Sequence, residues 1–232
     1  MWWNQTNRNE RLQPILSQSV FSLADLLTHL LAIADEASDL ARAFYRKSHE
    51  LEVIRKGDST PLTDADTGLH HLICERLEAL FPSLPILSEE SEVAQLEDRL
   101  KWPACWVVDP LDGTKEFIKR NGEFTVNIAL IANNKPVLGV IYVPVTKTLY
   151  YAIVAEQKAY KTILEKHRVA ENELFASKDA MSIEKENNET IKVVGSRSHK
   201  SAETEAFIQS IEQQGKQVEI VSKGSSLKCC NM

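Results

Sequence analysis

Residues 106–114 read WVVDPLDGT, an apolar run that ends in two carboxylates, Asp109 and Asp112. The apolar residues predict a short strand, and Pro110 predicts a turn where the strand ends. Such a turn can aim Asp109, the carbonyl oxygen of Leu111 and Asp112 at one point. Hard divalent cations such as Mg2+ prefer oxygen ligands at about 2.0–2.1 Å. The run therefore predicts a metal site at the end of a strand.

A second acidic pair lies upstream, at the end of another short apolar run. Ile86 and Leu87 are followed by Ser88, Glu89 and Glu90. If the two strands end at the same edge of one sheet, Glu89 is brought beside Asp109. Three carboxylates then converge, which is more charge than a single metal ion needs and predicts cations that offset the repulsion.

Two further features favour phosphate chemistry. Gly113 and Thr114 open a predicted short helix through Ile118, and backbone N–H groups at such a start favour a phosphate. The segment TDAD, residues 63–66, places Asp66 at the start of another helix. There a carboxylate could accept a proton from a threonine hydroxyl, so an Asp66–Thr114 pair could orient an attacking water.

Each motif taken alone also has a structural explanation. Asp66 fits a helix cap, Glu89 and Glu90 fit a solvated acidic turn, and DPLDG is a common turn composition. The combination is more informative than its parts, because three acidic clusters each follow or open an apolar element.

The hydrophobic pattern predicts helices, then strands, then a mixed segment. A long amphipathic helix is expected over about 22–48, and a second begins near Thr63 and ends by Pro82. These two helices are expected on one sheet. The expected strands are 86–87, 106–108, 124–131, 137–143 and 149–155, with a hairpin turn at 133–136. Residues 165–189 are expected to be irregular, and 191–194, 202–213 and 218–221 predict a β-α-β unit.

Composition excludes several classes of protein. The chain has 232 residues, 43% of them apolar, and a formal net charge of −6. This gives no basic footprint for a nucleic acid polymer. The four cysteines lack CxxC spacing, which favours a reducing cytoplasm over a disulfide framework. Met1–Val20 lacks the apolar core of a signal peptide, and no apolar run reaches the length of a transmembrane helix.

Three segments resemble one family in order and spacing. PLTDAD at 61–66, SEE at 88–90 and WVVDPLDGT at 106–114 are similar to the N-terminal signatures of the inositol monophosphatase superfamily. KEFI at 115–118 and GEFTVNI at 122–128 look most like its CysQ branch, the 3'(2'),5'-bisphosphate nucleotidases. VGSRSH at 194–199 and GSSLK at 224–228 resemble segments that line the nucleotide side of the cleft. The resemblance covers about residues 22–228.

The resemblance implies a site and a fold. Glu89, Asp109 and the Leu111 carbonyl would hold one Mg2+, and Asp109 and Asp112 a second. Thr114, paired with Asp66, would activate the water. Glu89, Leu111, Asp112, Gly113 and Thr114 would contact the substrate. The implied fold is α/β, of the α+β type, with α-β-α-β-α layers of which the last is incomplete. We expect three parts: an N-terminal extension (1–21), a metal-binding phosphatase lobe (22–160) and a partial C-terminal lobe (161–232).

The chain departs from the family after GSSLK. The family continues into a strand, a Trp-Asp-x-Ala-Ala motif and a final helix pair, whereas this sequence ends at Met232. We therefore expect a C-terminal truncation that removes one ligand of the second metal together with core packing.

Three functions follow as hypotheses. The first is Mg2+-dependent hydrolysis of adenosine 3',5'-bisphosphate to AMP and phosphate. The second is an inositol monophosphatase-type sugar phosphatase, which relative turnover of the two substrates would distinguish. The third is a catalytically impaired, truncated remnant. A homo-oligomer and peripheral association with the inner face of the cell membrane stay open.

Overall fold

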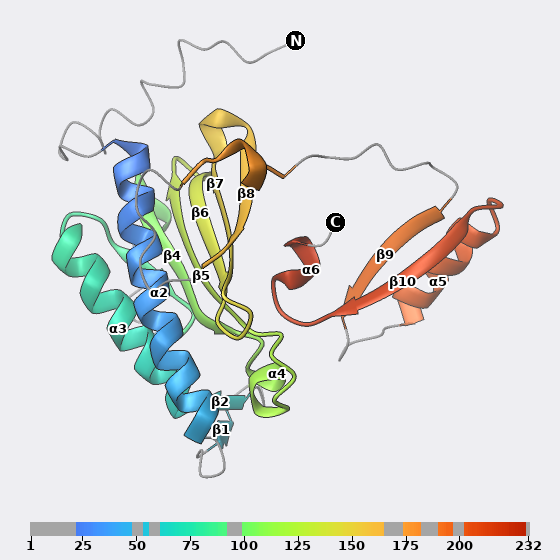
Figure 1. Ribbon diagram of the computed structural model, residues 1–232, viewed down its shortest axis with the longest axis horizontal. Coiled ribbons are helices and arrows are strands. Elements are labelled where there is room, and N and C mark those ends of the chain that lie inside the picture. Colours follow the sequence, from blue (N-terminus) through green and yellow to red (C-terminus); the bar gives the residue numbers. More distant parts are fainter. Residues whose placement is uncertain are drawn as a thin grey trace.

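Two long helices, α2 (Leu23–Lys47) and α3 (Asp64–Leu80), lie side by side over one face of a sheet in the computed structural model (Figure 1). The structure describes residues 22–47, 53–55, 61–91, 99–164, 174–181, 190–196 and 202–230. The expected N-terminal extension, 1–21, and much of the expected irregular segment, 165–189, lie outside these residues. The prediction that both helices pack on one sheet is confirmed.

Helix α2 forms because its leucines and alanines recur on one face. Its buried positions include Leu26, Leu30, Ala34 and Ala37, which follow helical spacing. The hydroxyl of Ser22 accepts the backbone N–H of Asp25 at 3.1 Å, and Asp25 Oδ2 accepts the N–H of Ser22 at 2.7 Å. The predicted helix over about 22–48 is confirmed.

The main sheet has six strands in the order β3-β4-β5-β6-β7-β8. Their bounds are β3 (Ile86–Ser88), β4 (Ala104–Asp112), β5 (Thr125–Ala132), β6 (Lys135–Val143), β7 (Thr148–Ile153) and β8 (Lys158–Ile163). Strand β3 pairs parallel with β4, and every other pair is antiparallel. The five predicted strands are confirmed, although the last ends at Ile153, where the 3-10 turn η3 (Val154–Glu156) follows.

Three strands were not predicted. The edge strand β8 buries only Tyr160, so the sequence shows little alternation there. Strands β1 (Val53–Arg55) and β2 (Pro61–Thr63) form a separate antiparallel pair between α2 and α3. Three residues are too few to show a period of two. Two further 3-10 turns are η2 (Arg99–Lys101) and η5 (Ser177–Asp179).

The core lies between the helix pair and the sheet. Leu27 and Leu30 of α2, Leu69 and Ile73 of α3, and Trp106 of β4 are fully buried in it. The strands bring alternate side chains to this face, since successive residues of a strand point to opposite sides. This packing fixes the carboxyl end of β4, where the acidic run begins.

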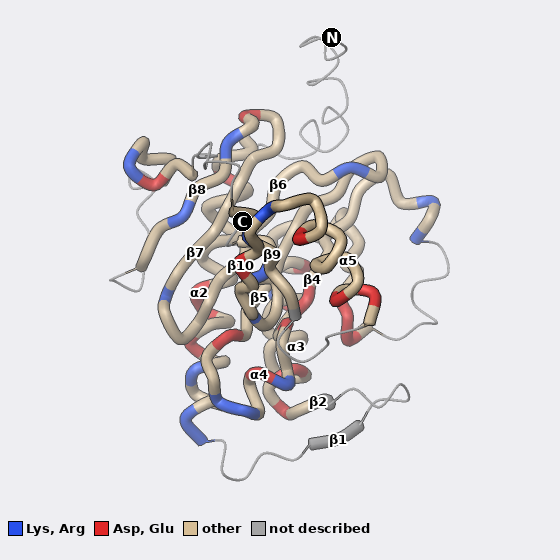
Figure 2. Tube along the Cα trace, turned by 90° about the vertical axis from the view of Figure 1, so that its right-hand side faces the viewer, with Lys and Arg blue, Asp and Glu red and all other residues tan. Residues whose placement is uncertain are grey.

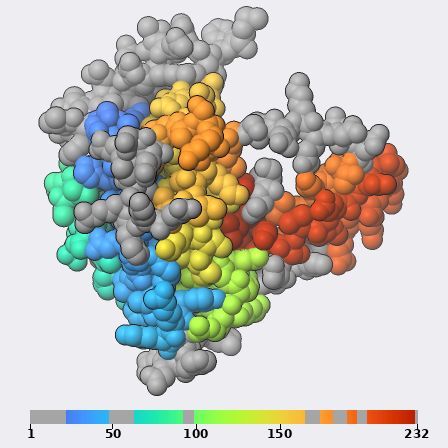
Figure 3. All heavy atoms as spheres, viewed as in Figure 1, coloured from blue at the N-terminus to red at the C-terminus, as the bar shows by residue number. Residues whose placement is uncertain are grey.

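A β-α-β unit follows the sheet, as predicted. Strands β9 (Thr190–Ser196) and β10 (Gln217–Lys223) pair in parallel, and α5 (Ala202–Glu212) connects them. In Figure 3 this unit forms the orange-red lobe beside the main body. Strand β8 continues to Ile163, so the boundary expected at residue 160 falls inside it. We keep the division into two lobes as a proposal, with its boundary after Ile163.

The short helix α6 (Leu227–Cys230) returns the chain to the main sheet. Leu227 packs with Val143 of β6 and Tyr150 of β7. Figure 1 shows α6 on the side of the sheet opposite α2 and α3. The turn between β10 and α6 is thereby carried to the end of β4.

Basic and acidic residues occur in several parts of the described trace (Figure 2). None of the helices within the described ranges is both long enough and apolar enough to cross a membrane.

Candidate active site

The end of β4 carries a bulge that brings its two aspartates together. Asp109 pairs with Asn127 of β5, whereas Asp112 pairs with Thr125, so the register shifts between them. One strand then has an additional residue, which bends it and redirects its side chains. Pro110 lies at this point because a proline is tolerated where ladder hydrogen bonds are interrupted.

Glu89 reaches the same place from the neighbouring strand. Strand β3 runs parallel to β4, with Ser88 opposite Val108. The N–H of Glu89 donates to the carbonyl of Val108 at 3.0 Å, which continues the ladder one residue past β3. Parallel strands end at the same edge of a sheet, so Glu89 lies beside Asp109, as the sequence predicted.

Asp109 is the most strongly perturbed acid of this group. Burial, followed by the negative charges of Asp112 and Glu89, raises the pKa of Asp109 to about 8. Its Oδ1 atom is buried and, within the described residues, has no hydrogen-bond partner. A buried, unpartnered carboxylate oxygen beside two like charges is costly unless a positive charge is added.

Asp66 and Thr114 form a hydrogen-bonded pair. Thr114 Oγ1 donates to Asp66 Oδ1 at 3.0 Å. Asp66 Oδ2 meanwhile accepts the N–H and the hydroxyl of Thr63 at 2.8 and 2.6 Å. Burial raises the pKa of Asp66, and the hydrogen bonds from Thr63 and Thr114 oppose that rise. Asp66 therefore both caps α3 and contacts Thr114.

The turn into helix α4 (Thr114–Ile118) depends on Gly113. Gly113 has φ +91°, which L side chains rarely adopt. A Cβ atom there would lie 3.1 Å from Ser225 Cβ and 3.2 Å from the carbonyl oxygen of Glu123. The backbone around Gly113 is thus closely surrounded by segments from two other parts of the chain.

Asp112 is held by the distant turn before α6. Its Oδ2 atom accepts both the N–H and the hydroxyl of Ser226 at 2.5 Å. Asn127 Nδ2 donates to the same oxygen at 3.3 Å and to Ser226 Oγ at 2.9 Å. Ser226 is 114 positions from Asp112, and no local sequence pattern indicates this contact.

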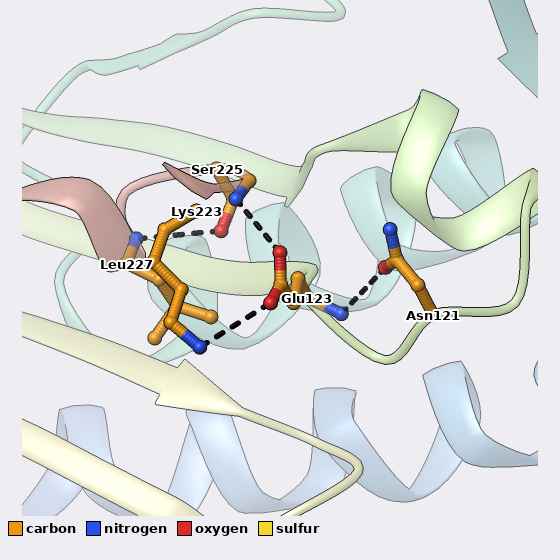
Figure 4. A network of polar contacts seen from close by, with 6 residues as sticks. Asn121, Glu123, Lys223, Ser225 and Leu227 are labelled. Carbon is orange, nitrogen blue, oxygen red and sulfur yellow. Dashed lines mark hydrogen bonds and ion pairs between the residues drawn. The ribbon is translucent and has the colours of Figure 1, made fainter. Parts of the chain in front are cut away.

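A second contact holds the same turn, as Figure 4 shows. The carboxylate of Glu123 bridges Lys223 Nζ at 3.3 Å and the N–H of Gly224 at 2.9 Å. Asn121 Oδ1 accepts the N–H of Glu123 at 2.9 Å, which steadies the segment before β5. Glu123 and Asp112 together fasten residues 223–226 to the acidic end of β4.

The oxygen-rich donor set fits a hard divalent cation. Glu89, Asp109 and Asp112 supply carboxylates, Leu111 supplies a carbonyl, and Asp109 Oδ1 lacks a partner among the described residues. No three His, Cys, Asp or Glu side chains in the described part of the chain already surround one point. The Asp112 Oδ2 atom is instead directed at Ser226.

The structure thus gathers every predicted site residue at one end of β4. Asp66 and Thr114 form one pair, Glu89, Asp109 and Asp112 form one acidic cluster, and Leu111 and Gly113 connect them. Sequence reasoning missed the supporting residues, which are Glu123, Asn127, Lys223 and Ser226. Glu123 and Asn127 lie in the segment GEFTVNI, Ser226 lies in GSSLK, and Lys223 directly precedes GSSLK. A linear pattern does not indicate that these two segments are in contact.

Comparison with known proteins places this geometry in context. The model of the inositol monophosphatase family matches residues 22–232. A 3'(2'),5'-bisphosphate nucleotidase CysQ from Salmonella typhimurium is 43% identical over 205 residues, which are 88% of this chain and 75% of that protein. The CysQ protein of Escherichia coli K12 is 41% identical with the same coverage.

Solved structures agree with the sequence comparison. The crystal structure of CysQ from Bacteroides thetaiotaomicron, a bacterial member of the inositol monophosphatase family, has a TM-score of 0.71 and 40% identity. The match covers 87% of this chain and 73% of that one. A Thermotoga maritima IMPase has a TM-score of 0.63 at 22% identity, with 88% and 70% covered, which supports the fold alone.

Proposed function

The chain belongs to the inositol monophosphatase family, and from this premise we propose that it hydrolyses the 3'-phosphate of adenosine 3',5'-bisphosphate to give AMP and inorganic phosphate. It is a phosphoric monoester hydrolase, and its substrate is a small phosphate ester. The CysQ relatives at about 40% identity favour the bisphosphate nucleotide over an inositol phosphate.

One observation carries the proposal. The buried Asp109 carboxylate lies beside Glu89 and Asp112, with its Oδ1 atom lacking a partner in the described chain. This arrangement is destabilising in a protein that only needs to fold, since buried like charges repel. It becomes favourable when cations and an anionic substrate occupy the site.

Four residues would hold the metal ions. Glu89, Asp109 and the Leu111 carbonyl would hold one Mg2+, and Asp109 and Asp112 would hold a second. Divalent cations at such a site supply positive charge that stabilises the transferring phosphoryl group and the leaving oxygen. Asp109 is the only side chain assigned to both ions, so it is the most sensitive ligand.

The Asp66–Thr114 pair would move the proton. Thr114 Oγ1 takes a proton from the attacking water while its own proton passes to Asp66 Oδ1, 3.0 Å away. The water oxygen then bonds to phosphorus in line with the breaking bond to the 3'-oxygen, which takes a proton from solvent. Burial raises the pKa of Asp66, which makes its carboxylate a better proton acceptor.

Gly113 and Thr114 would contact the scissile phosphate. Gly113 has no side chain at a point where a Cβ would approach within 3.1–3.3 Å of three neighbouring atoms. Without a side chain, Gly113 can adopt the φ of +91° that turns the chain into α4, and the first N–H groups of α4 would contact the phosphate oxygens. The reaction is assigned to the cytoplasm, which agrees with four cysteines that are all free.

The test is phosphate release from two substrates at equal concentration. Adenosine 3',5'-bisphosphate and inositol 1-phosphate are compared with Mg2+ and with EDTA. We expect Mg2+-dependent release that is greater from the nucleotide. Greater release from inositol 1-phosphate would contradict the proposed substrate and favour the sugar phosphatase hypothesis. No release from either would leave the impaired remnant as the better hypothesis.

A further inference from the structure

Asp112 accepts several hydrogen bonds through one carboxylate oxygen. Its Oδ2 atom has four donors within 3.5 Å: the N–H and the hydroxyl of Ser226, Asn127 Nδ2, and Thr125 Oγ1. An oxygen with this many donors is fixed in position. The two bonds from Ser226, both 2.5 Å, are the shortest of the four.

The Ser226 hydroxyl has a defined direction. Asn127 Nδ2 donates to Ser226 Oγ at 2.9 Å, and Ser226 Oγ donates to Asp112 Oδ2 at 2.5 Å. The hydroxyl thus accepts from an amide, which cannot accept through its nitrogen, and gives its proton to a carboxylate. This relay joins three residues from β5, from the turn before α6 and from the end of β4.

We propose that Ser226 is a positioning residue for Asp112, which it holds by one oxygen so that the other is available to a divalent cation. The inference rests on the proposed function, because it takes Asp112 as a metal ligand. Carboxylates that bind metals are commonly held by hydrogen bonds from a second layer of residues, and the loss of such a bond weakens metal binding.

This role differs from simple docking of the turn. Glu123 already fastens the turn through Lys223 and Gly224. Ser225, next to Ser226, uses its hydroxyl to accept the N–H of Leu227 at 3.4 Å. Removal of the Ser225 hydroxyl therefore perturbs the same turn but leaves the relay to Asp112 in place.

The experiment measures Mn2+ binding by electron paramagnetic resonance, without substrate, for four 232-residue chains. These are the unaltered chain, Ser226→Ala, Ser226→Thr and the matched control Ser225→Ala. We expect Ser226→Ala to lower the affinity for the second ion, which Asp112 would hold, about tenfold. This is toward the low end of such effects, because the backbone N–H of residue 226 still donates to Asp112. Ser226→Thr should recover the affinity, and Ser225→Ala should bind as the unaltered chain does.

Thermal unfolding in EDTA separates positioning from stability. All four chains should unfold within a few degrees of one another, since the turn keeps its Glu123 contacts. Unchanged Mn2+ affinity in Ser226→Ala, or equal weakening in Ser225→Ala, would overturn the inference alone. No Mn2+ binding by the unaltered chain would overturn the proposed metal site as well, so the two failures can be told apart.

Discussion

Thr114 Oγ1 lies 3.0 Å from Asp66 Oδ1, although the two residues are 48 positions apart in the sequence. Asp66 comes from the first turn of α3 and Thr114 from the first residue of α4. Each helix start is a local feature, but the distance between them is set by how α3 packs on β4. The pair is thus a product of the fold as well as of two motifs.

The first prediction concerns this pair. Because Asp66 and Thr114 would act on one water as a unit, the double alanine variant should be little slower than the worse single variant. The measurement is kcat for Asp66→Ala, Thr114→Ala and the double variant. Asp64→Ala is the control, because Asp64 is exposed in the same helical turn. Multiplicative losses in the double variant would instead indicate independent roles.

The second prediction concerns Asp109. Asp109→Asn should lower phosphate release about a thousandfold, since the two metal ions that Asp109 would hold supply several kcal/mol of transition-state stabilisation. The metal-free variant should unfold at about the same temperature as the unaltered chain at pH 7, because an Asp109 carboxyl with a pKa of about 8 is already largely neutral there. Asp64→Asn gives the matched isosteric control and should keep full activity. Comparable turnover by folded Asp109→Asn would refute the metal assignment.

The third prediction tests the close approach at Gly224. A Cβ on Gly224 would lie 2.5 Å from Glu116 Cγ and 3.1 Å from the carbonyl oxygen of Glu123. Gly224→Ala should therefore lower the free energy of unfolding by about 1–3 kcal/mol. Gly195→Ala is the control, since a Cβ on Gly195 meets nothing within 4 Å, and should change it by about 0.5 kcal/mol or less. Urea unfolding measures both, and equal effects would show that the turn can shift without cost.

The fourth prediction concerns pH and the contact between the two long helices. Arg76 donates to Glu36 through Nε at 2.9 Å and through NH2 at 2.7 Å, and the hydrogen bond from Arg76 lowers the pKa of Glu36. A lowered folded-state pKa contributes stability above the unfolded pKa, about 4.3, and loses it as the pH falls through the lower folded value.

Glu36→Gln should therefore lower the free energy of unfolding at pH 7 by about 0.2–1 kcal/mol, because both side chains are 44% exposed and water screens the pair. The difference from the unaltered chain should shrink as the pH falls below about 4.3. Glu75→Gln is the control, since Glu75 lies 3.5 Å from Arg76 and is 75% exposed. A difference that grows in acid would contradict the assigned pKa direction.

Much of the fold could be read from local patterns. The spacing of leucines and alanines predicted α2, and the capping residues Thr63 and Asp66 predicted the start of α3, because both signals lie within a few residues of one another. Strand β8 was missed because its packing depends on Tyr160 stacking on Tyr151, a cross-strand contact with no local periodicity. The β1–β2 pair was missed because its strands have three residues each.

The sequence by itself determined which residues are the candidates for the chemistry. Glu89, Asp109, Asp112, Asp66 and Thr114 each follow or open an apolar element, and that local order is written in the chain. Only the tertiary structure decided how these groups are held. The parallel pairing of β3 with β4 brought Glu89 beside Asp109, and the return of the chain to α6 brought Ser226 to Asp112. Contacts between segments more than a hundred residues apart depend on core packing and sheet pairing. A local sequence pattern does not specify how far apart two such segments lie in space.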